Sequence, residues 1–139
     1  MRSRPSRSTA RRGVAVVELA ILLPVMVFLL LVGIDYCRLF YFSQVVCNCT
    51  RNGAMYATDP YSTAASPYAS LEEAAKADAD SDVQSQLTVT STTGTDTYGS
   101  YTQVSVSYPF STLTSYPWLP KTVTITRTAQ VRVAPQVPK

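Results

Sequence analysis

The stretch "RRGVAVVELAILLPVMVFLLLVGI", residues 11–34, decides the fold of this 139-residue chain, because it is apolar almost throughout and holds one acidic residue, Glu18. As an α-helix at ~1.5 Å per residue, residues 14–34 extend about 31 Å, the thickness of a bilayer's hydrocarbon core. A central carboxylate costs about 3 kcal/mol, whereas each Val, Ile, Leu or Phe contributes roughly 0.3–0.6 kcal/mol to insertion. The sequence therefore predicts one transmembrane helix despite Glu18.

A cleaved secretory signal is the alternative interpretation, because an arginine-rich start followed by an apolar run is typical of such peptides. The apolar region of a signal is about 7–15 residues long and ends at a small-x-small cleavage site. Residues 14–34 are longer and lead into "DYCRLFYF" instead. We therefore expect a retained anchor.

The residues before the apolar run indicate its orientation. Five of the chain's 12 basic residues lie there without any acidic residue: Arg2, Arg4, Arg7, Arg11 and Arg12. The positive-inside rule keeps such a segment in the cytoplasm. We therefore predict a cytoplasmic basic leader (residues 1–13), a transmembrane helix (14–34) and an extracytoplasmic domain (35–139). Since the chain beyond the leader is net negative, the basic balance gives no indication of nucleic-acid binding.

The apolar run also carries a resemblance to a known family. "RRG" followed by "VAVVE" resembles the processing site of type IV prepilins, where an inner-membrane peptidase cuts after glycine and a glutamate stands fifth in the mature chain. The longer pattern through "RNGAMYA", and the tail "VSVSYPFSTLTSYPWLPKTVTITRTAQVRV", are similar to the TadE-like family, the minor pilins or pseudopilins of tight-adherence pilus systems. One departure is Met55, which stands where the family often has arginine.

The resemblance implies a prepilin peptidase cut between Gly13 and Val14. It also implies a place in the bacterial inner membrane, with membrane lipid, other pilins or pseudopilins and the pilus assembly platform as partners. The new amine on Val14 would then lie four residues from Glu18, which could pair with it or with the amine of a neighbouring subunit. The alternative is that Glu18 only extends towards the membrane interface beside the arginines.

Pro24 lies in the middle of the predicted span. It removes one backbone hydrogen bond and usually kinks or loosens a helix. Membrane helices tolerate proline, so Pro24 either has no special role or gives a kink that helps subunits pack in an assembly. Both readings stay open.

The outer region predicts an α+β domain. Helix continues through residues 35–57, residues 58–67 form a loop, and Ser70 with Glu73 makes a capping box that opens a short second helix through "LEEAAKADA". Three antiparallel strands follow: "LTVTS", then after the turn "TTGTDTYG" an alternation of apolar and polar residues ending at Phe110, then the longest strand after "YPWLP". Val123, Ile125, Ala129, Val131 and Val133 share the apolar face of that last strand, interrupted by Arg127.

Candidate chemistry is sparse. The chain has no histidine, which excludes Ser/His and Cys/His nucleophile systems and removes the commonest metal ligand. "DADSD" (residues 78–82) begins like a calcium loop, but the glycine and late glutamate of such a loop are missing, so we expect a solvated helix end. We therefore predict no cofactor, no metal and no catalytic residue.

Three cysteines and an aromatic cluster complete the candidates. Cys47 and Cys49 are about 200° apart around a helix and Cys37 lies about 15 Å from Cys47, so no disulfide forms within that helix. The thiols are either small buried groups or, alternatively, an intersubunit bridge. Four aromatic residues just past the span predict a membrane-interface belt: Tyr36, Phe40, Tyr41 and Phe42.

Together these features predict a non-enzymatic minor pilin or pseudopilin of a tight-adherence, type IV-like pilus apparatus, processed by a prepilin peptidase. The alternative is an unprocessed single-pass membrane protein whose outer domain binds a surface or envelope partner. Cleavage after Gly13 distinguishes the two.

Overall fold

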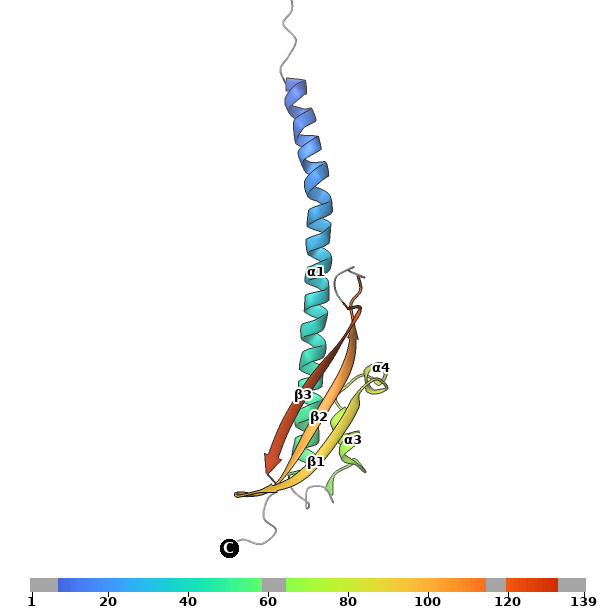
Figure 1. Ribbon diagram of the computed structural model, residues 1–139. Coiled ribbons are helices and arrows are strands. Elements are labelled where there is room, and N and C mark those ends of the chain that lie inside the picture. The colour runs from blue at the N-terminus through green and yellow to red at the C-terminus, as the bar shows by residue number, and fades with distance from the viewer. Residues whose placement is uncertain (1–7, 59–64, 115–119, 133–139) are drawn as a thin grey trace, which may run out of the picture. The chain divides into compact units, whose positions relative to one another are not determined.

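The computed structural model describes residues 8–58, 65–114 and 120–132, with the side chains of residues 8–12 excluded. The chain forms two compact units, Met1–Cys37 and Arg38–Lys139. The elements, in order, are α1 (Ser8–Tyr56), α3 (Leu71–Lys76), α4 (Ser81–Gln84), β1 (Thr88–Asp96), β2 (Gly99–Ser111) and β3 (Thr122–Arg132) (Figure 1). The predicted α+β class, with a long N-terminal helix and a three-stranded antiparallel sheet, is confirmed.

α1 contains both the predicted span and the helix predicted to follow it. It begins at Ser8, inside the predicted leader, and ends at Tyr56, one residue short of the expected end. Residues 1–7 of the leader lie outside the described part of the chain. Pro24 lies inside α1 without ending it. Because proline has no N–H, the carbonyl of Ala20 receives no helical hydrogen bond from that position.

The sheet has the order β1-β2-β3, and both pairs are antiparallel. The prediction that the last strand is the longest is wrong, since β2 has 13 residues and β3 has 11. The predicted turn is also too wide. Thr92 to Asp96 pair with β2, and only Thr97 and Tyr98 turn the chain, followed by Gly99 at φ 121°. Glycine adopts such a positive φ without steric cost.

Gly94 explains why β1 runs through a stretch that its threonine and glycine content made look like a turn. It pairs with Tyr101 of β2, and a Cβ at Gly94 would lie 2.6 Å from the tyrosine ring. The ring therefore covers the glycine from the neighbouring strand, as aromatic residues do for glycines in sheets. The surrounding β-branched threonines favour extended backbone.

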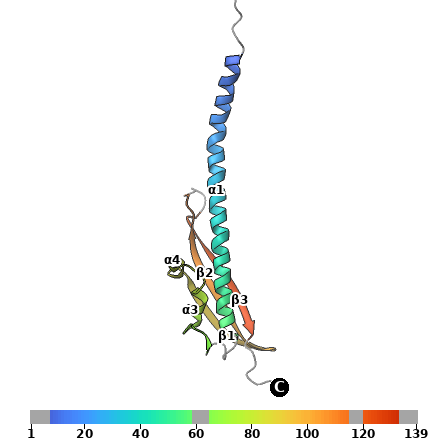
Figure 2. The same cartoon turned by 180° about the vertical axis from the view of Figure 1, so that it is seen from behind.

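The second unit has its core between the sheet and the C-terminal part of α1. The predicted alternation in β2 is confirmed, because Val104, Val106, Tyr108 and Phe110 are all buried. They pack with Val46, Cys49, Ala79, Val83, Leu87 and Ile125. Figure 2 shows α1 crossing the sheet, with α3 and α4 on its β1 side. α4, which the sequence did not predict, contributes Val83 to this core.

β3 is less buried than predicted. Ile125 is buried, and Ala129 and Val131 are half-buried, but Val123 is 41% exposed and Arg127 is exposed. β3 is an edge strand, so one of its sides has no neighbouring strand to cover it. Val133 lies outside the described residues.

The capping box at α3 is confirmed. The Glu73 N–H donates to the Ser70 Oγ at 3.1 Å, and the Glu73 carboxylate accepts from the Ala69 N–H at 2.9 Å. The helix ends at Lys76, earlier than the predicted "LEEAAKADA". Most of the predicted loop at residues 58–67 lies outside the described part of the chain.

Candidate processing and anchoring segment

Gly13, Val14 and Glu18 lie within the first turns of α1 that have described side chains. Gly13 is exposed, a Cβ added there would meet nothing within 4 Å, and Val14 is 60% exposed. Glu18 is exposed and follows Val14 by four residues, about 6 Å along the helix and on the same face. The helix thus places the acid one turn after the residue that follows the expected cut, whereas Gly13, five positions before Glu18, lies about 140° away around the helix.

Pro24 does not join this group. Pro24 lies six positions after Glu18, which places it about 240° around the helix and about 9 Å further along. Any effect of Pro24 on packing therefore acts on another face of α1 from that of Glu18.

The apolar side chains of residues 14–34 are uncovered. Leu23 is 55% exposed, Leu30 is 61% exposed, and the large apolar side chains around them are exposed to a similar degree. Among the described residues, α1 is the one helix long and apolar enough to cross a membrane, and no residue in its most apolar stretch is buried. A soluble protein rarely exposes such a continuous apolar surface, so residues 14–34 are a candidate membrane span.

The predicted aromatic belt is only partly exposed. Tyr36 is 68% exposed, Phe40 60% and Tyr41 54%. The placement of Phe42 in that belt is wrong, because its ring stacks on Tyr108 at 4.9 Å between centroids and packs against the core. On a helix, one position further along is a rotation of about 100°, which turns Phe42 onto the sheet. Its ring still meets the Tyr41 ring edge-on, at 5.4 Å between centroids.

The three cysteines are free thiols in different surroundings. Cys37 is exposed, Cys47 is half-buried and Cys49 is fully buried. Burial raises the pKa of the Cys49 thiol, and the negative charge of Asp78 raises this pKa further. The interpretation of the cysteines as small buried groups therefore holds for Cys49 and not for Cys37, which is exposed.

The three aspartates of "DADSD" are exposed, and Asp80 is the N-cap residue of α4. Within the described ranges, no group of three or more His, Cys, Asp or Glu side chains could hold a metal ion. Asp78 and Asp80 precede α4, and Asp82 lies in its first turn.

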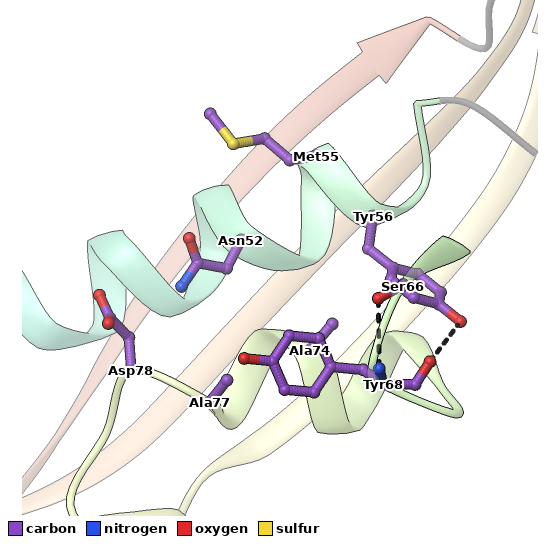
Figure 3. A pocket seen from close by; sticks show the side chains of 8 residues that line it. All are labelled: Asn52, Met55, Tyr56, Ser66, Tyr68, Ala74, Ala77 and Asp78. Atoms are coloured by element: carbon purple, nitrogen blue, oxygen red, sulfur yellow. Dashed lines mark hydrogen bonds between the residues drawn. The ribbon is translucent and has the colours of Figure 1, made fainter. Parts of the chain in front are cut away.

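A pocket that the sequence did not reveal lies where the end of α1 meets α3. Its volume is about 420 Å³. Its lining residues are Asn52, Met55, Tyr56, Ser66, Tyr68, Ala74, Ala77 and Asp78 (Figure 3). Gly53 permits the close approach of α1 here, because a Cβ would lie 3.1 Å from both the Ala75 Cβ and the Val104 Cγ1. The "RNGAMYA" pattern contained this glycine, but nothing in the pattern indicated its neighbours.

A second unforeseen cluster closes the far end of the sheet. Arg132 forms two hydrogen bonds to the Asp96 carboxylate, at 2.8 and 3.0 Å, and its guanidinium lies 5.2 Å from the centre of the Tyr98 ring. The hydrogen bond from Arg132 lowers the pKa of Asp96, and the hydrogen bond from the Tyr98 N–H lowers it further. All three side chains are on the surface, and the cluster ties β3 to the β1–β2 turn.

The described residues thus form a small α+β domain that follows one candidate membrane span. Residues 13–55 match the family model of the TadE-like proteins, which confirms the predicted resemblance over that segment. The match begins at Gly13 and covers nearly all of α1 that follows. Comparisons with curated proteins and with solved structures found no match.

Proposed function

We propose that this chain is a minor pilin or pseudopilin of a tight-adherence, type IV-like pilus apparatus, and that a prepilin peptidase cuts it between Gly13 and Val14. The match to TadE-like proteins over residues 13–55 carries the proposal. It supports a boundary at Gly13, because the matched segment begins at the residue after which the cut is expected. The exposed apolar side chains of residues 14–34 are consistent with the proposed transmembrane segment.

The proposed protein works by being anchored and assembled and not by catalysis. The basic leader at residues 1–13 stays in the cytoplasm, residues 14–34 span the inner membrane, and residues 35–139 lie outside. Its proposed partners are the peptidase, other pilins or pseudopilins and the assembly platform, with lipid around the span.

In this proposal Glu18 neutralises the amine that cleavage creates on Val14. The one-turn spacing allows the pair to form within one helix or between neighbouring helices in an assembly. A charged amine without a partner is costly to bury among apolar helices. Removing one member of a buried charge pair costs about 3–5 kcal/mol, which corresponds to a loss of roughly two to four orders of magnitude in an association constant.

The experiment is intact-mass measurement of the chain from cells that contain the matching peptidase. A mature chain beginning at Val14 supports the proposal, and Gly13→Leu should block the cut by placing a bulky side chain at the cleaved bond. A chain that keeps residues 1–13, or one cut near Ile34, would favour the unprocessed single-pass protein or the secretory signal.

Glu18→Ala tests the assembly step separately. This variant should be made, inserted and cleaved, since alanine makes the span more apolar, but pilus production should fail. Glu18→Asp keeps the charge with a shorter reach and should retain partial function. Full pilus production by a correctly cleaved Glu18→Ala chain would show that the carboxylate only extends to the interface.

A further inference from the structure

The pocket between the end of α1 and α3 combines aromatic walls with one carboxylate. Two hydrogen bonds connect the residues around its tyrosines: the Tyr56 hydroxyl donates to the Tyr68 carbonyl at 3.3 Å, and the Tyr68 N–H donates to the Ser66 Oγ at 3.2 Å. Figure 3 shows Asp78 at one end of the pocket and the Tyr56 ring at the other, with the Tyr68 ring between them and its hydroxyl end towards Ala77 and Asp78. Met55 at the rim is 62% exposed.

Asp78 is the charged group of this pocket. Its carboxylate is exposed and forms no ion pair or hydrogen bond within the described ranges. A carboxylate beside tyrosine faces suits a guanidinium, which binds a carboxylate through two N–H groups and stacks on aromatic rings. A lysine ammonium matches this combination less well, because it is a compact, strongly hydrated charge.

Most basic side chains of the second unit are already engaged. Arg132 pairs with Asp96, Lys76 pairs with Glu72, Arg127 donates to the Ser43 Oγ at 2.7 Å, and Arg38 lies over the Phe110 ring. In the described part of the second unit, the remaining basic side chains are Arg51 and Lys121, both exposed and without a hydrogen bond or ion pair.

Arg51 is the better placed of the two. It precedes the pocket residue Asn52 on α1, so the two lie at the same height along the helix but about 100° apart around it. Lys121 lies next to the Ser111–Thr122 pair, at the end of the sheet where Arg38 donates to the Ser111 carbonyl. Arg38 and Asn52 are about 21 Å apart along α1. Of these two side chains, Arg51 therefore lies at the level of the pocket along α1, so it can reach the pocket of a second copy whose α1 runs parallel.

We propose that the pocket at Asp78 receives Arg51 of a second copy of this chain. The Arg51 guanidinium pairs with the Asp78 carboxylate and stacks against the tyrosine walls, while Asn48, three residues before Arg51 on α1 and also exposed, covers the rim. The contact uses two different surfaces, so each copy keeps one free pocket or one free arginine. Such a heterologous contact does not close as a two-fold dimer; further copies add to it and form a ring, a row or a helix.

The inference depends on anchoring of the copies in one membrane and not on cleavage after Gly13. It can therefore be tested apart from the proposed function, using the full chain in lipid nanodiscs or membranes. A photo-crosslinking amino acid replaces Tyr68 in chains labelled with ¹⁵N, and these are mixed with unlabelled chains. The expected product joins residue 68 of one isotope to a peptide containing Arg51 of the other.

Charge reversal provides the decisive comparison. Arg51→Glu and Asp78→Lys should each lower the cross-linked fraction about tenfold or more, because like charges then face each other. The double variant restores the opposite charges and should recover most of the product. Lys121→Glu is the matched control and should have no effect. Both reversed side chains are exposed, so the fold is retained.

Several outcomes would overturn the inference: unaffected single variants, no recovery in the double variant, products within one isotope only, or capture of Lys121. In cells, a cross-link from residue 68 to another protein in place of this chain would also overturn it. If the contact persists in the uncleaved Gly13→Leu chain while pilus production is lost, the two proposals are separated. Failure of the contact in a correctly cleaved chain leaves the proposed function standing.

Discussion

The two parts of α1 differ in how their side chains are covered, although they belong to one continuous helix. In the first unit, residues 14–34 are apolar all around the helix apart from Glu18, and they are exposed except for the half-buried Leu31. In the second unit, Phe42, Val46, Cys49 and Gly53 face the interior at a spacing of four, three and four residues. The exposed positions between them include the polar residues Gln44, Asn48 and Arg51. A helix that is apolar all around needs an apolar environment, whereas a single stripe needs one protein neighbour.

The backbone of α1 is the same in both parts, because the helical hydrogen bonds continue from the exposed part into the part that packs on the sheet. The side-chain pattern differs between the two parts. Where the stripe begins, near Phe42, α1 acquires the sheet as its neighbour. The two parts should therefore respond differently to the same substitution.

The largest expected effect comes from placing a charge in each part. Val46→Asp buries a carboxylate at a position of 0% exposure without a cation, which costs several kcal/mol out of a domain stability of about 5–15 kcal/mol. The domain should lose its resistance to protease. Val27→Asp, in the apolar part, should lower membrane insertion by about 3 kcal/mol while the inserted chains keep a folded domain.

Gln44→Asp serves as the control, because Gln44 is exposed on the same part of α1 as Val46. Its domain should remain resistant to protease. If Val46→Asp behaves like Gln44→Asp, then α1 does not pack on the sheet through this stripe, and the distinction between the two parts of the helix is wrong.

The next effect concerns the aromatic residues where the stripe begins. Phe42→Ala removes a ring stacked on Tyr108 and 5.9 Å from the Phe110 ring, and should lower the free energy of unfolding by about 2–3 kcal/mol. Phe40→Ala should change it by less than about 0.5 kcal/mol, since Phe40 is 60% exposed. Pulse proteolysis of the full chain in detergent across a urea series measures both. Equal losses would mean that Phe40 also packs in the core.

A smaller effect should come from adding one methyl group to a glycine in each part. Gly53→Ala should cost about 1 kcal/mol, because crowding against Ala75 and Val104 outweighs the gain in helix propensity. Both neighbours are held by their own elements, so neither moves away easily. Gly33→Ala meets nothing within 4 Å and should cost nothing. A Gly53→Ala domain as stable as the wild type would show that α1 shifts freely against α3.

Much of this organisation followed from the sequence, because it depends on local periodicity. The long helix, the capping box at Ser70 and the alternation in β2 each lie within one segment, and each is confirmed. The extent of β1 was predicted too short because Gly94 was read as a turn residue. Its structural role depends on the Tyr101 ring, which comes from the next strand.

The pocket and the role of Gly53 could not be predicted, since both depend on how α3 packs against the end of α1. Asp78 and Tyr56 are more than twenty residues apart, and no spacing rule connects them. Phe42 was placed in the aromatic belt because its neighbours along the chain are aromatic. The burial of Phe42 depends on which side of α1 packs against the sheet, and only the structure shows that side.

The smallest expected effect is a pH dependence from Cys49. Burial, followed by the charge of Asp78, raises the pKa of this thiol in the folded domain, whereas the thiol of the unfolded chain titrates near 9.0. Folding therefore favours the protonated thiol, and its contribution is fully present below that pH and is lost as pH rises through the folded-state pKa. Denaturant midpoints measured at increasing pH above 9 should fall more steeply in the wild type than in Cys49→Ala, which has no thiol to titrate. Cys47→Ala should retain the wild-type slope, because Cys49 is unchanged in it. If the denaturant midpoints of the wild type and of Cys49→Ala fall equally with pH, the Cys49 thiol is in contact with solvent. The side of α1 that faces the sheet would then not be buried at Cys49.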